Sequence, residues 1–560
     1  MSNFLGAEMI YRLIIETKQG EIVCGSLDFK RNQRFESSGF VVETVTQVNG
    51  GYTRLEISVR GKEKAFITVR AEYDSGELFT FSGKKEKYGV FRQSPHDVWD
   101  HVIATPKEAV PMVALYKDSE YTVLFSDNPA KYDNYTVQIV SPEEKYMQIS
   151  SGDNGKISGG ELTFAPYYVQ NPRFTVILFK SKATSLLELR KDIFYKIDAA
   201  FGEKKLSKFH AICFSSNYMH YRCNEMGSSK CWVVPGIDYC NKQYPRDAFW
   251  QSMIFPLEME QECYDGVYKG RYRYAENALI FLIWSYRLKK KGGRPDEERI
   301  NDAIEYISAH VKNGTYITGE EEKLAYRSWY DLCSFENDDV VSYNQGLFVV
   351  AIMAAKALGI NIPFDEKEAN KRYNELFNVE KGYFPLSMKK TQILSLDPTV
   401  GDLLAYFLFD KKLLKDKNVV AHYRKTFQVS NTVYGAKITC RENGEYCTLD
   451  DYSAYGEYDC GLEHATKGDY SWGGSYYLYE MLFHMAAYIH GEKQAEDNMI
   501  ERSAIDFRVG GTYFEHINTV TGRGNKPNQG WNCCVYPIWQ KMIEKGMADE
   551  RFFLEMEKIL

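Results

Sequence analysis

The pattern of apolar residues changes once along this chain, close to Thr184, and that change limits the folds open to it. Before Thr184, apolar and polar residues alternate with a period of two, which is the pattern of half-buried strands. After it, apolar residues recur at helical spacing, as in Leu186, Leu189, Ile193 and Ile197. The sequence therefore predicts a multidomain β + α protein, with an all-β part followed by a mostly helical part.

The first part predicts an antiparallel β-sandwich over residues 1–182. Leu55, Ile57 and Val59 alternate with polar residues, and the glycine pair at 50–51 precedes this run as a turn signal. Further runs of strand type are 66–69, 121–125 and 174–179. Short strands separated by turns at this spacing are typical of a sandwich.

The second part predicts a helical linker over 183–204 and a helical domain over 205–560. The expected helices after the linker are 247–261, 272–290, 297–312, 343–358, 366–377, 398–413, 417–427, 473–490, 493–507, 530–545 and 549–559. Asp397 is expected to cap the helix at 398, with Pro398 in its first turn. About twelve helices, counting the linker, predict six helical hairpins closed into a ring, an (α/α)6 barrel.

Composition excludes several classes of partner. The net charge of −7 comes without a basic stripe, so no nucleic acid partner is expected. No apolar run reaches membrane-spanning length, so no membrane partner is expected. The 12 cysteines form no C-x-x-C pair, which indicates neither a zinc site nor a disulfide framework, and no metal or cofactor is expected.

Cysteine usage and the first residues indicate a cytoplasmic protein. Many thiols without a disulfide pattern favour a reducing compartment. The sequence MSNFLGAEMIYRL lacks a basic region followed by a long apolar stretch, although a secreted or periplasmic chain with its signal removed would look the same.

Residues 244–250, Tyr-Pro-Arg-Asp-Ala-Phe-Trp, indicate a sugar subsite. Arg246 and Asp247 stand side by side at a helix start among aromatic residues. The aspartate can accept hydrogen bonds from two hydroxyls, the arginine can donate to others, and Tyr244 or Trp250 can stack on a sugar ring. A helix-capping aspartate with a locally paired arginine explains the same spacing.

A second cluster follows Trp329. Four carboxylates fall within the nine residues from Asp331 to Asp339, just before a helix. Packed acids beside an indole can keep one proton near neutral pH, as a general acid requires. Asp331 directly follows the aromatic pair and is the preferred acid, Glu336 is the alternative, and Asp338 with Asp339 fits ordinary helix N-terminal charges.

Two later motifs carry aromatic residues beside glycines. Trp472 precedes Gly473 at a helix entry, which permits close approach of a ligand or simply forms a turn. Glu515 lies between Phe514 and His516, ahead of a loop that leads to Gln529 and Trp531. A carboxylate placed this way can activate a water in a sugar-cleaving enzyme.

Taken in order, these motifs resemble those of the six-hairpin glycosidases. This (α/α)6-barrel group includes glucoamylase, trehalase, processing α-glucosidase and the glucosidase part of glycogen-debranching enzyme. Residues 244–247 are similar to Trp-Pro-Arg-Asp of glucoamylases, and residues 328–331 look like Thr-Trp-Met-Asp of debranching glucosidases. Residues 513–516, with Gly522 and 530–532, look like the Glu-Tyr-Tyr…Thr-Gly…Trp-Ser segment, although His516 stands where the family has an aromatic residue.

The resemblance implies an exo-acting, inverting glycoside hydrolase that removes a terminal, α-linked, glucose-like sugar from an oligosaccharide or glycoside. It implies that Asp331 is the general acid, that Glu515 is the base, and that Arg246 with Asp247 holds the terminal sugar. The other expected substrate contacts are Tyr244, Trp250, Trp329, Glu336, Trp472, His516, Gln529 and Trp531.

Three other interpretations stay open. A phosphorylase on the same barrel needs an anion site, and an epimerase relies on paired histidines, of which only His516 is well placed. A non-catalytic carbohydrate-binding protein is the third, and it would be favoured by Asp331 and Glu515 lying apart. The identity of the sugar, a bound calcium and the oligomeric state are likewise left open by the sequence.

Overall fold

The computed structural model describes the chain in a series of segments. They are residues 9–17, 20–61, 66–73, 77–80, 83–84, 91–92, 102–103, 112–127, 135–139, 146–151, 155–158, 161–164, 173–185, 188–189, 192–193, 195–196, 221–223, 231–233, 235, 244–255, 257–267, 274–319, 327–330, 333–452, 467–510, 513–527, 529–535, 538–539 and 542.

The chain divides into two compact units. The first comprises residues 1–242, 527–536 and 557–560, and the second comprises 243–526 and 537–556. The sheets and the residues predicted as a linker therefore belong to one unit. The predicted start of the helical domain at residue 205 lies outside the described residues.

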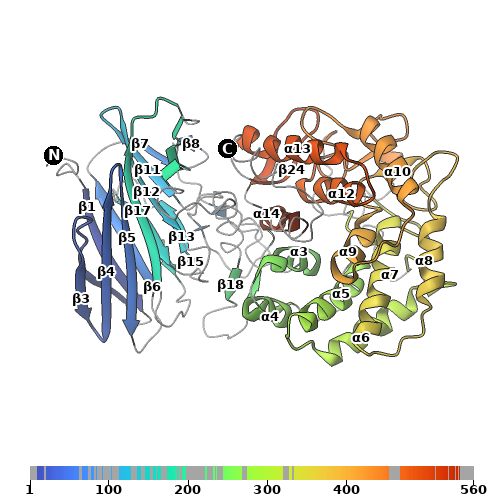
Figure 1. Ribbon diagram of the computed structural model, residues 1–560, viewed down its shortest axis with the longest axis horizontal. Helices are drawn as coiled ribbons and strands as arrows, with labels where there is room; N and C mark the ends of the chain where they lie inside the picture. Colours follow the sequence, from blue (N-terminus) through green and yellow to red (C-terminus); the bar gives the residue numbers. More distant parts are fainter. Residues whose placement is uncertain are drawn as a thin grey trace. The chain divides into compact units, whose positions relative to one another are not determined.

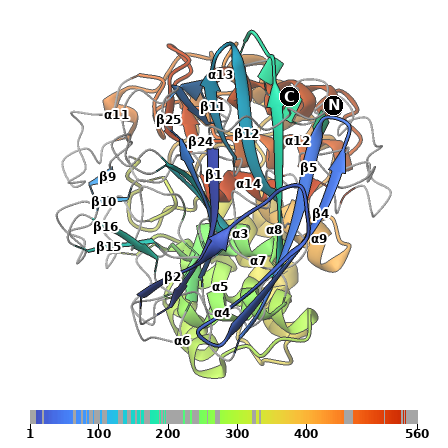
Figure 2. The ribbon, with the colours of Figure 1, turned by 90° about the vertical axis from the view of Figure 1, so that its left-hand side faces the viewer.

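Two antiparallel sheets contain most of the described residues of the first unit (Figures 1 and 2). The smaller has the order β13 (Tyr135–Ile139), β14 (Tyr146–Ser151), β6 (Phe66–Tyr73), β1 (Met9–Thr17), β2 (Gly20–Ser26). The larger has the order β3 (Gln33–Ser37), β4 (Phe40–Asn49), β5 (Tyr52–Gly61), β17 (Arg173–Ser181), β12 (Glu120–Asp127), β11 (Met112–Lys117), β7 (Glu77–Thr80), β8 (Gly83–Lys84).

The two sheets share one hydrophobic core. Leu13 and Ile15 of β1 belong to the same buried cluster as Leu55, Ile57 and Val59 of β5. The β5 residues alternate with partly exposed polar neighbours, because successive side chains of a strand point to opposite faces. The structure thus confirms the predicted N-terminal antiparallel sheet region.

Short strand pairs connect other segments. In the first unit they are β9 (Phe91–Arg92) with β10 (Val102–Ile103), β15 (Gly155–Ser158) with β16 (Glu161–Phe164), and β18 (Tyr221–Cys223) with β19 (Cys231–Val233). The others are β20 (Val311–Lys312) with β21 (Thr315–Tyr316), β22 (Ile393–Ser395) with β23 (Thr439–Arg441), and β24 (Phe514–Ile517) with β25 (Gly524–Pro527).

The helices of the second unit form two layers, coloured from green to red in Figure 1. The inner layer consists of α3 (Pro245–Gln251), α5 (Glu276–Lys290), α7 (Ser342–Ala357), α9 (Val400–Phe409) and α12 (Tyr477–Ile489), each of which contacts the next. The outer layer consists of α4 (Leu257–Gly266), α6 (Glu297–Ala309), α8 (Glu366–Glu375), α10 (Asp416–Ser430) and α13 (Gln494–Gly510). Two short helices are α11 (Leu449–Tyr452), in this unit, and α14 (Gly530–Cys533), in the first.

Residue patterns explain which helices are inner. Helix α7 is buried from Ser342 through Ala355, and such an apolar surround suits a helix that is covered on every side. Helix α8 buries only Ala369 and Tyr373, so its other faces are polar. Among the described residues, five inner helices and five outer helices agree with a hairpin arrangement. The last predicted hairpin, 530–545 with 549–559, is described only in part, so the (α/α)6 barrel itself stays a prediction.

Two inner helices approach each other through glycines. A Cβ on Gly401 of α9 would lie 2.3 Å from the carbonyl carbon of Gly346 in α7. Side chains larger than hydrogen are therefore excluded at this crossing. The contact fixes the N-terminal turns of α7 and α9 side by side, which matters because the predicted motifs lie just before these turns.

Two sequence expectations are wrong in detail. The predicted helix 247–261 is interrupted, since α3 is followed by a 3-10 turn at Ser252–Ile254 and an extended Phe255 before Pro256. The helix predicted from 398 begins at Val400 with Thr399 as its N-cap residue, so Asp397 is not the cap. No helix among the described residues combines the length and apolar character needed to cross a bilayer.

Candidate functional site

The start of α3 places an arginine between two carboxylates. Pro245 occupies the first turn, where its missing N–H costs nothing, and Arg246 and Asp247 follow with 8% and 5% of their surface exposed. Arg246 Nε donates to Asp247 Oδ1 at 2.9 Å, and Nη1 donates to Glu276 Oε1 at 3.2 Å. Glu276 is fully buried at the start of α5. The structure thus brings together two predicted site residues and one that the sequence did not reveal.

Aromatic rings face this cluster. The Arg246 guanidinium carbon lies 5.8 Å from the Tyr274 ring centre and 5.9 Å from that of Trp329. A cation beside an aromatic face is favoured electrostatically. The contact brings Trp329, from the loop before α7, to the sugar subsite predicted at α3.

Trp329 is held by α12 and by the segment before α9. Its ring stacks on Tyr479 at 4.0 Å with 14° between the planes, and its indole nitrogen donates to Asp397 Oδ2 at 2.6 Å. Asp397 is 1% exposed, and burial raises the pKa of its carboxyl above the ordinary value, with the Trp329 bond acting in the opposite direction. Asp397 therefore orients the indole, and it is a functional candidate that the sequence had indicated only as a helix cap.

The loop that carries the predicted acid is only partly described. Asp331 lies outside the described residues. Residues on both sides of it are ordered by α7: the Asn344 side-chain amide donates to Arg327 O at 2.8 Å, and the Arg327 guanidinium donates to Phe335 O at 2.7 Å. The backbone N–H of Cys333 donates to Tyr330 O at 3.1 Å.

The alternative acid faces solvent. The Glu336 side chain is 76% exposed and forms an ion pair with Lys389 at 3.2 Å. Neighbouring Asp339 is buried and accepts hydrogen bonds from Ser387 Oγ at 2.7 Å and from the Lys389 amide at 3.1 Å. Burial raises the Asp339 pKa, and these hydrogen bonds act against that shift. Asp339 shapes the turn before α7, whereas Glu336 has the setting of a surface side chain.

Glu515 and His516 lie on β24 beside α12. Both are 6% exposed. The His516 ring contacts Tyr476 at 5.5 Å, and Tyr476 in turn meets the edge of Trp329 at 5.5 Å. The strand is joined to the segment before α12 by paired backbone bonds between Ser475 and Ile517, each 2.9 Å. Tyr476 thus links the predicted base strand to Trp329. It belongs to the motif around Trp472, although nothing in the sequence indicated a role for this tyrosine.

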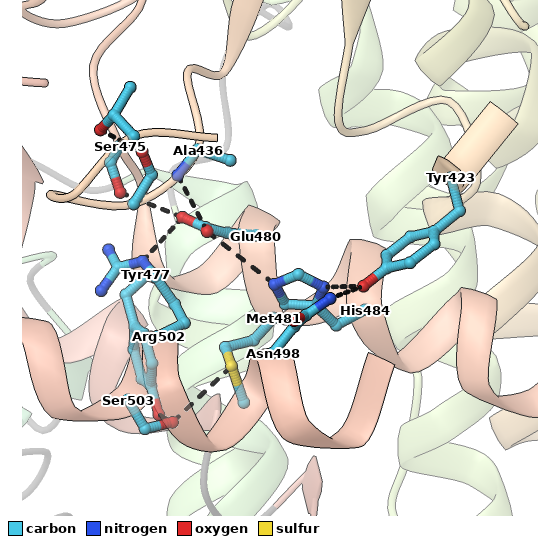
Figure 3. A network of polar contacts seen from close by, with 12 residues as sticks. Tyr423, Ala436, Ser475, Tyr477, Glu480, Met481, His484, Asn498, Arg502 and Ser503 are labelled. Carbon is cyan, nitrogen blue, oxygen red and sulfur yellow. Dashed lines mark hydrogen bonds and ion pairs between the residues drawn. The ribbon is translucent and has the colours of Figure 1, made fainter. Parts of the chain in front are cut away.

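A buried ionic network fixes that strand (Figure 3). Glu480 accepts from Ala436 N at 2.9 Å, Ser475 Oγ at 3.0 Å and Arg502 Nε at 2.7 Å. Arg502 also donates to Asp506, which accepts the backbone N–H of Phe514 at 3.1 Å. The residue before Glu515 is therefore attached to α13 through a charged acceptor, and the residue before Tyr476 is attached to α12.

The same network extends along α12 to a histidine. Figure 3 shows His484 and Asn498 both directed at the Tyr423 hydroxyl, with separations of 2.9 Å and 2.7 Å. Burial opposes ionisation of Glu480, yet Arg502, His484 and the Ala436 amide together hold its pKa below the ordinary value. Because Glu480 stays ionised near neutral pH, it keeps accepting hydrogen bonds from Ala436, Ser475 and Arg502.

The remaining predicted contacts occupy varied settings. Tyr244 is half-buried as the N-cap residue of α3, and Trp250 is 1% exposed and packs its ring against Phe249 at 5.2 Å. Trp472 is half-buried, and its indole nitrogen donates to Cys447 O at 2.6 Å. Trp250 has the burial of a core residue.

Gln529 and Trp531 belong to the first unit, unlike the other predicted contacts. Gln529 precedes α14 and is fully buried, and Trp531 within α14 is 3% exposed. The amide of Gly530 between them donates to Pro235 O at 2.7 Å.

Comparisons with known proteins give structural matches only. No model of a protein family matches the chain, and no curated protein matches it. The structure is similar to GH63 mannosylglycerate hydrolase from Thermus thermophilus in complex with Tris and D-glycerate, at 10% identity over 56% of this chain and 97% of that one, with a TM-score of 0.37.

Two further matches are of the same kind. The Thermus thermophilus hydrolase in complex with glucose matches at 10% identity over 55% of this chain and 95% of that one, with a TM-score of 0.38. A wild-type glycosidase matches at 10% identity over 62% of this chain and 100% of that one, with a TM-score of 0.41.

Proposed function

We propose that the chain is an exo-acting glycoside hydrolase that releases a terminal, glucose-like, α-linked sugar with inversion. One observation carries the proposal. Arg246 lies between the carboxylates of Asp247 and Glu276 against Trp329, and Trp329 is connected through Tyr476 to the strand of Glu515. A sugar-binding cluster and a candidate base thus belong to one contiguous set of side chains.

The chemistry of the Arg246 cluster suits a sugar. Guanidinium and carboxylate groups offer donors and acceptors at fixed spacing, which matches vicinal hydroxyls that both donate and accept. The indole of Trp329 adds an apolar face for the C–H side of a pyranose ring. Low exposure of 4–8% for Arg246, Asp247 and Trp329 favours strong polar interactions, because water competes little there.

The reaction would divide between two carboxyl groups. Asp331 would protonate the departing glycosidic oxygen, and Glu515 would take a proton from a water that attacks the opposite face of the sugar. Inversion needs space for that water, with roughly 6.5–9.5 Å between the carboxyl groups. The substrate would be an oligosaccharide or a simple glycoside.

Hydrolysis of a panel of aryl glycosides tests the proposal, with product anomers followed by NMR. We expect turnover of an α-glycoside with initial release of the β-anomer, and we expect Glu515→Gln to lower kcat by about 10²–10⁴-fold. Glu492→Gln is the matched control, since Glu492 pairs with Arg424, whose side chain is 71% exposed. Unchanged turnover in Glu515→Gln would refute its role as base, and retained configuration would refute inversion.

A non-catalytic carbohydrate-binding protein is the second candidate. The Arg246 cluster contains hydrogen-bonding groups and an aromatic face without any contribution from Asp331 or Glu515. Calorimetric titration with glucose and maltose separates the two functions. Sugar binding that Asp247→Ala abolishes, without hydrolysis of any glycoside in the panel, would favour the binding protein. Release of a sugar phosphate only when phosphate is added would instead indicate a phosphorylase.

A further inference from the structure

His516 lies beside Glu515 in a setting made of polar and aromatic groups. Its ring meets the edge of Tyr470 at 5.4 Å and 80°, and it is tilted by 34° against Tyr476 at 5.5 Å. The two tyrosines belong to the segment before α12, and the histidine belongs to β24. With 6% of its surface exposed, the imidazole is held in one orientation by packing.

Neighbouring groups fix the tautomer of this ring. The Asn525 side-chain nitrogen donates to Asp469 Oδ1 at 2.8 Å, and since an ionised carboxylate only accepts, the amide nitrogen must face Asp469. The same nitrogen lies 3.1 Å from His516 Nε2. Nε2 therefore accepts the second amide hydrogen, and the proton of the neutral imidazole is on Nδ1.

The protonated nitrogen faces the candidate base. Nδ1 of His516 is buried and has no hydrogen-bond partner among the described residues. It lies 3.9 Å from Glu515 Oε2, beyond a hydrogen bond but within reach of a small side-chain adjustment. Catalytic hydrogen bonds are often long without substrate and tighten when it binds.

We propose that His516 is a positioning residue for Glu515, with its Nδ1–H directed at the carboxylate by the Asn525–Asp469 pair. The inference rests on the proposed function. The bond holds the carboxylate in one orientation for accepting the proton of the attacking water, while His516 keeps its own proton throughout. A hydrogen bond to the ionised form favours that form, so His516 keeps Glu515 competent as a base at lower pH.

The groups around the ring are defined on both sides. The titratable groups that face the ring among the described residues are Asp469, Glu515, Tyr470 and Tyr476. Nε2 lies 3.1 Å from the Asn525 amide nitrogen and 3.4 Å from Asp469 Oδ1, whereas Nδ1 lies on the side of Glu515.

Two substitutions at His516 distinguish a role as hydrogen-bond donor from a role in packing. His516→Asn places an amide N–H close to the position of Nδ1, whereas His516→Phe keeps the ring and removes the donor. We expect His516→Phe to lower kcat by about 10–100-fold with KM changed less than about threefold, because a hydrogen bond to a charged group is lost. We also expect the acidic limb of its kcat/KM profile to move to higher pH, and His516→Asn to restore most of kcat and the limb.

A second histidine provides the control. His310 lies between Tyr306 at 4.4 Å and Tyr316 at 5.7 Å, much as His516 lies between two tyrosines. His310→Phe should alter thermal stability while leaving the acidic limb in place. A loss of kcat in His516→Phe with an unmoved limb and no rescue by asparagine would reduce His516 to a packing residue and overturn the proposal.

NMR of ¹⁵N-histidine-labelled protein tests the tautomer without any turnover. The His516 signals, assigned by their loss in His516→Asn, should show a protonated Nδ1 and an unprotonated Nε2 near neutral pH. An Nε2–H tautomer would overturn the proposal even in an active enzyme. The expected tautomer in a protein that hydrolyses no glycoside would locate the failure in the proposed function instead.

Discussion

Among the described residues of the second unit, two buried arginines lie between pairs of carboxylates, yet their surroundings differ. Arg502 bonds Glu480 and Asp506, and the side chains of all three are 1–2% exposed. Arg246 bonds Asp247 and Glu276, and its own side chain is 10% exposed. Ionic trios of the same composition therefore occur once with all three side chains almost fully buried, and once with Glu276 fully buried but Arg246 and Asp247 exposed by 10% and 7%.

The partners of the carboxylates make the contrast sharper. Backbone and hydroxyl donors complete the Arg502 trio, among them the amides of Ala436 and Phe514. Aromatic rings lie beside both arginines: Tyr477 is 5.2 Å from the Arg502 guanidinium carbon, and Tyr274 and Trp329 are 5.8 Å and 5.9 Å from that of Arg246. The first trio joins β24 to two helices, and the second lies beside Trp329, a predicted substrate contact. We call Arg502, Glu480 and Asp506 the Arg502 lock, and Arg246, Asp247 and Glu276 with Trp329 the candidate binding cluster. The residue types alone do not distinguish these two roles.

The largest expected effect is the loss of Arg502. In Arg502→Met, Glu480 and Asp506 stay buried without their cation, so the free energy of unfolding should fall by about 3–5 kcal/mol. Denaturant unfolding followed by circular dichroism measures the change. Arg372→Met is the matched control: its ion pairs with Glu368 and Glu375 lie at the surface, with side chains 35–46% exposed, and their loss should cost less than about 1 kcal/mol. Equal losses in the two variants would mean that the Arg502 trio is no lock.

The same conservative change at both arginines compares the trios directly. Lysine keeps the charge but loses the planar fork of donors. Arg502→Lys should lower the free energy of unfolding by about 1–3 kcal/mol because buried acceptors lose partners. Arg246→Lys should change it by less, since the Arg246 side chain is 10% exposed against 1% for Arg502, so a little water can reach its unsatisfied acceptors.

Activity should respond in the opposite order. Arg246→Lys should lower kcat/KM toward the best aryl glycoside by about 10–100-fold through the loss of a charge-assisted hydrogen bond. Arg502→Lys, assayed well below its unfolding midpoint, should alter kcat/KM less. A strongly destabilised Arg246→Lys with unchanged kcat/KM would show that both trios are structural.

The sequence predicts the elements better than it predicts the site. Alternation at Leu55, Ile57 and Val59 identifies a strand, because side chains two residues apart point to the same face of a sheet and are buried together. The apolar run at 343–358 likewise predicts a helix, and in the structure fourteen consecutive residues of α7, from Ser342 to Ala355, are buried. Local signals fail where a residue serves a distant partner: Asp397 looks like a helix cap, but its carboxylate accepts from Trp329.

Site residues remain hidden for the same reason. Glu276 at the first position of α5 has the appearance of an ordinary charge favoured by the helix dipole. Only the packing of α3 on α5 brings it to Arg246. Tyr476 and Tyr479 belong to a tyrosine-rich helix start, and nothing in their spacing indicates that Trp329 stacks there. Arg246, Asp247 and Trp329 could be predicted because each stands in a motif with recognisable chemistry.

The smallest expected effect concerns Asp397, which accepts the indole N–H of Trp329. Burial raises the pKa of Asp397, whereas the pKa of Glu480 in the Arg502 lock is lowered. Asp397→Asn keeps an oxygen for the Trp329 N–H and removes a buried charge, so near neutral pH it should change the free energy of unfolding by less than about 1 kcal/mol.

The pH dependence of that small difference is the sharper measurement. Because the pKa of Asp397 is higher in the folded protein than in the unfolded chain, its contribution to stability is fully present below the unfolded-state pKa and is lost as pH rises through the folded-state pKa. The stability of the wild type relative to Asp397→Asn should therefore decrease as pH rises. Asp365→Asn should show the opposite slope, since the amides of Glu368 and Lys367 lower the pKa of Asp365 at its helix cap. If the relative free energy of unfolding changed with pH in the same direction for both variants, the raised pKa of Asp397 would be contradicted. Asp397 would then resemble Glu480, whose pKa is lowered.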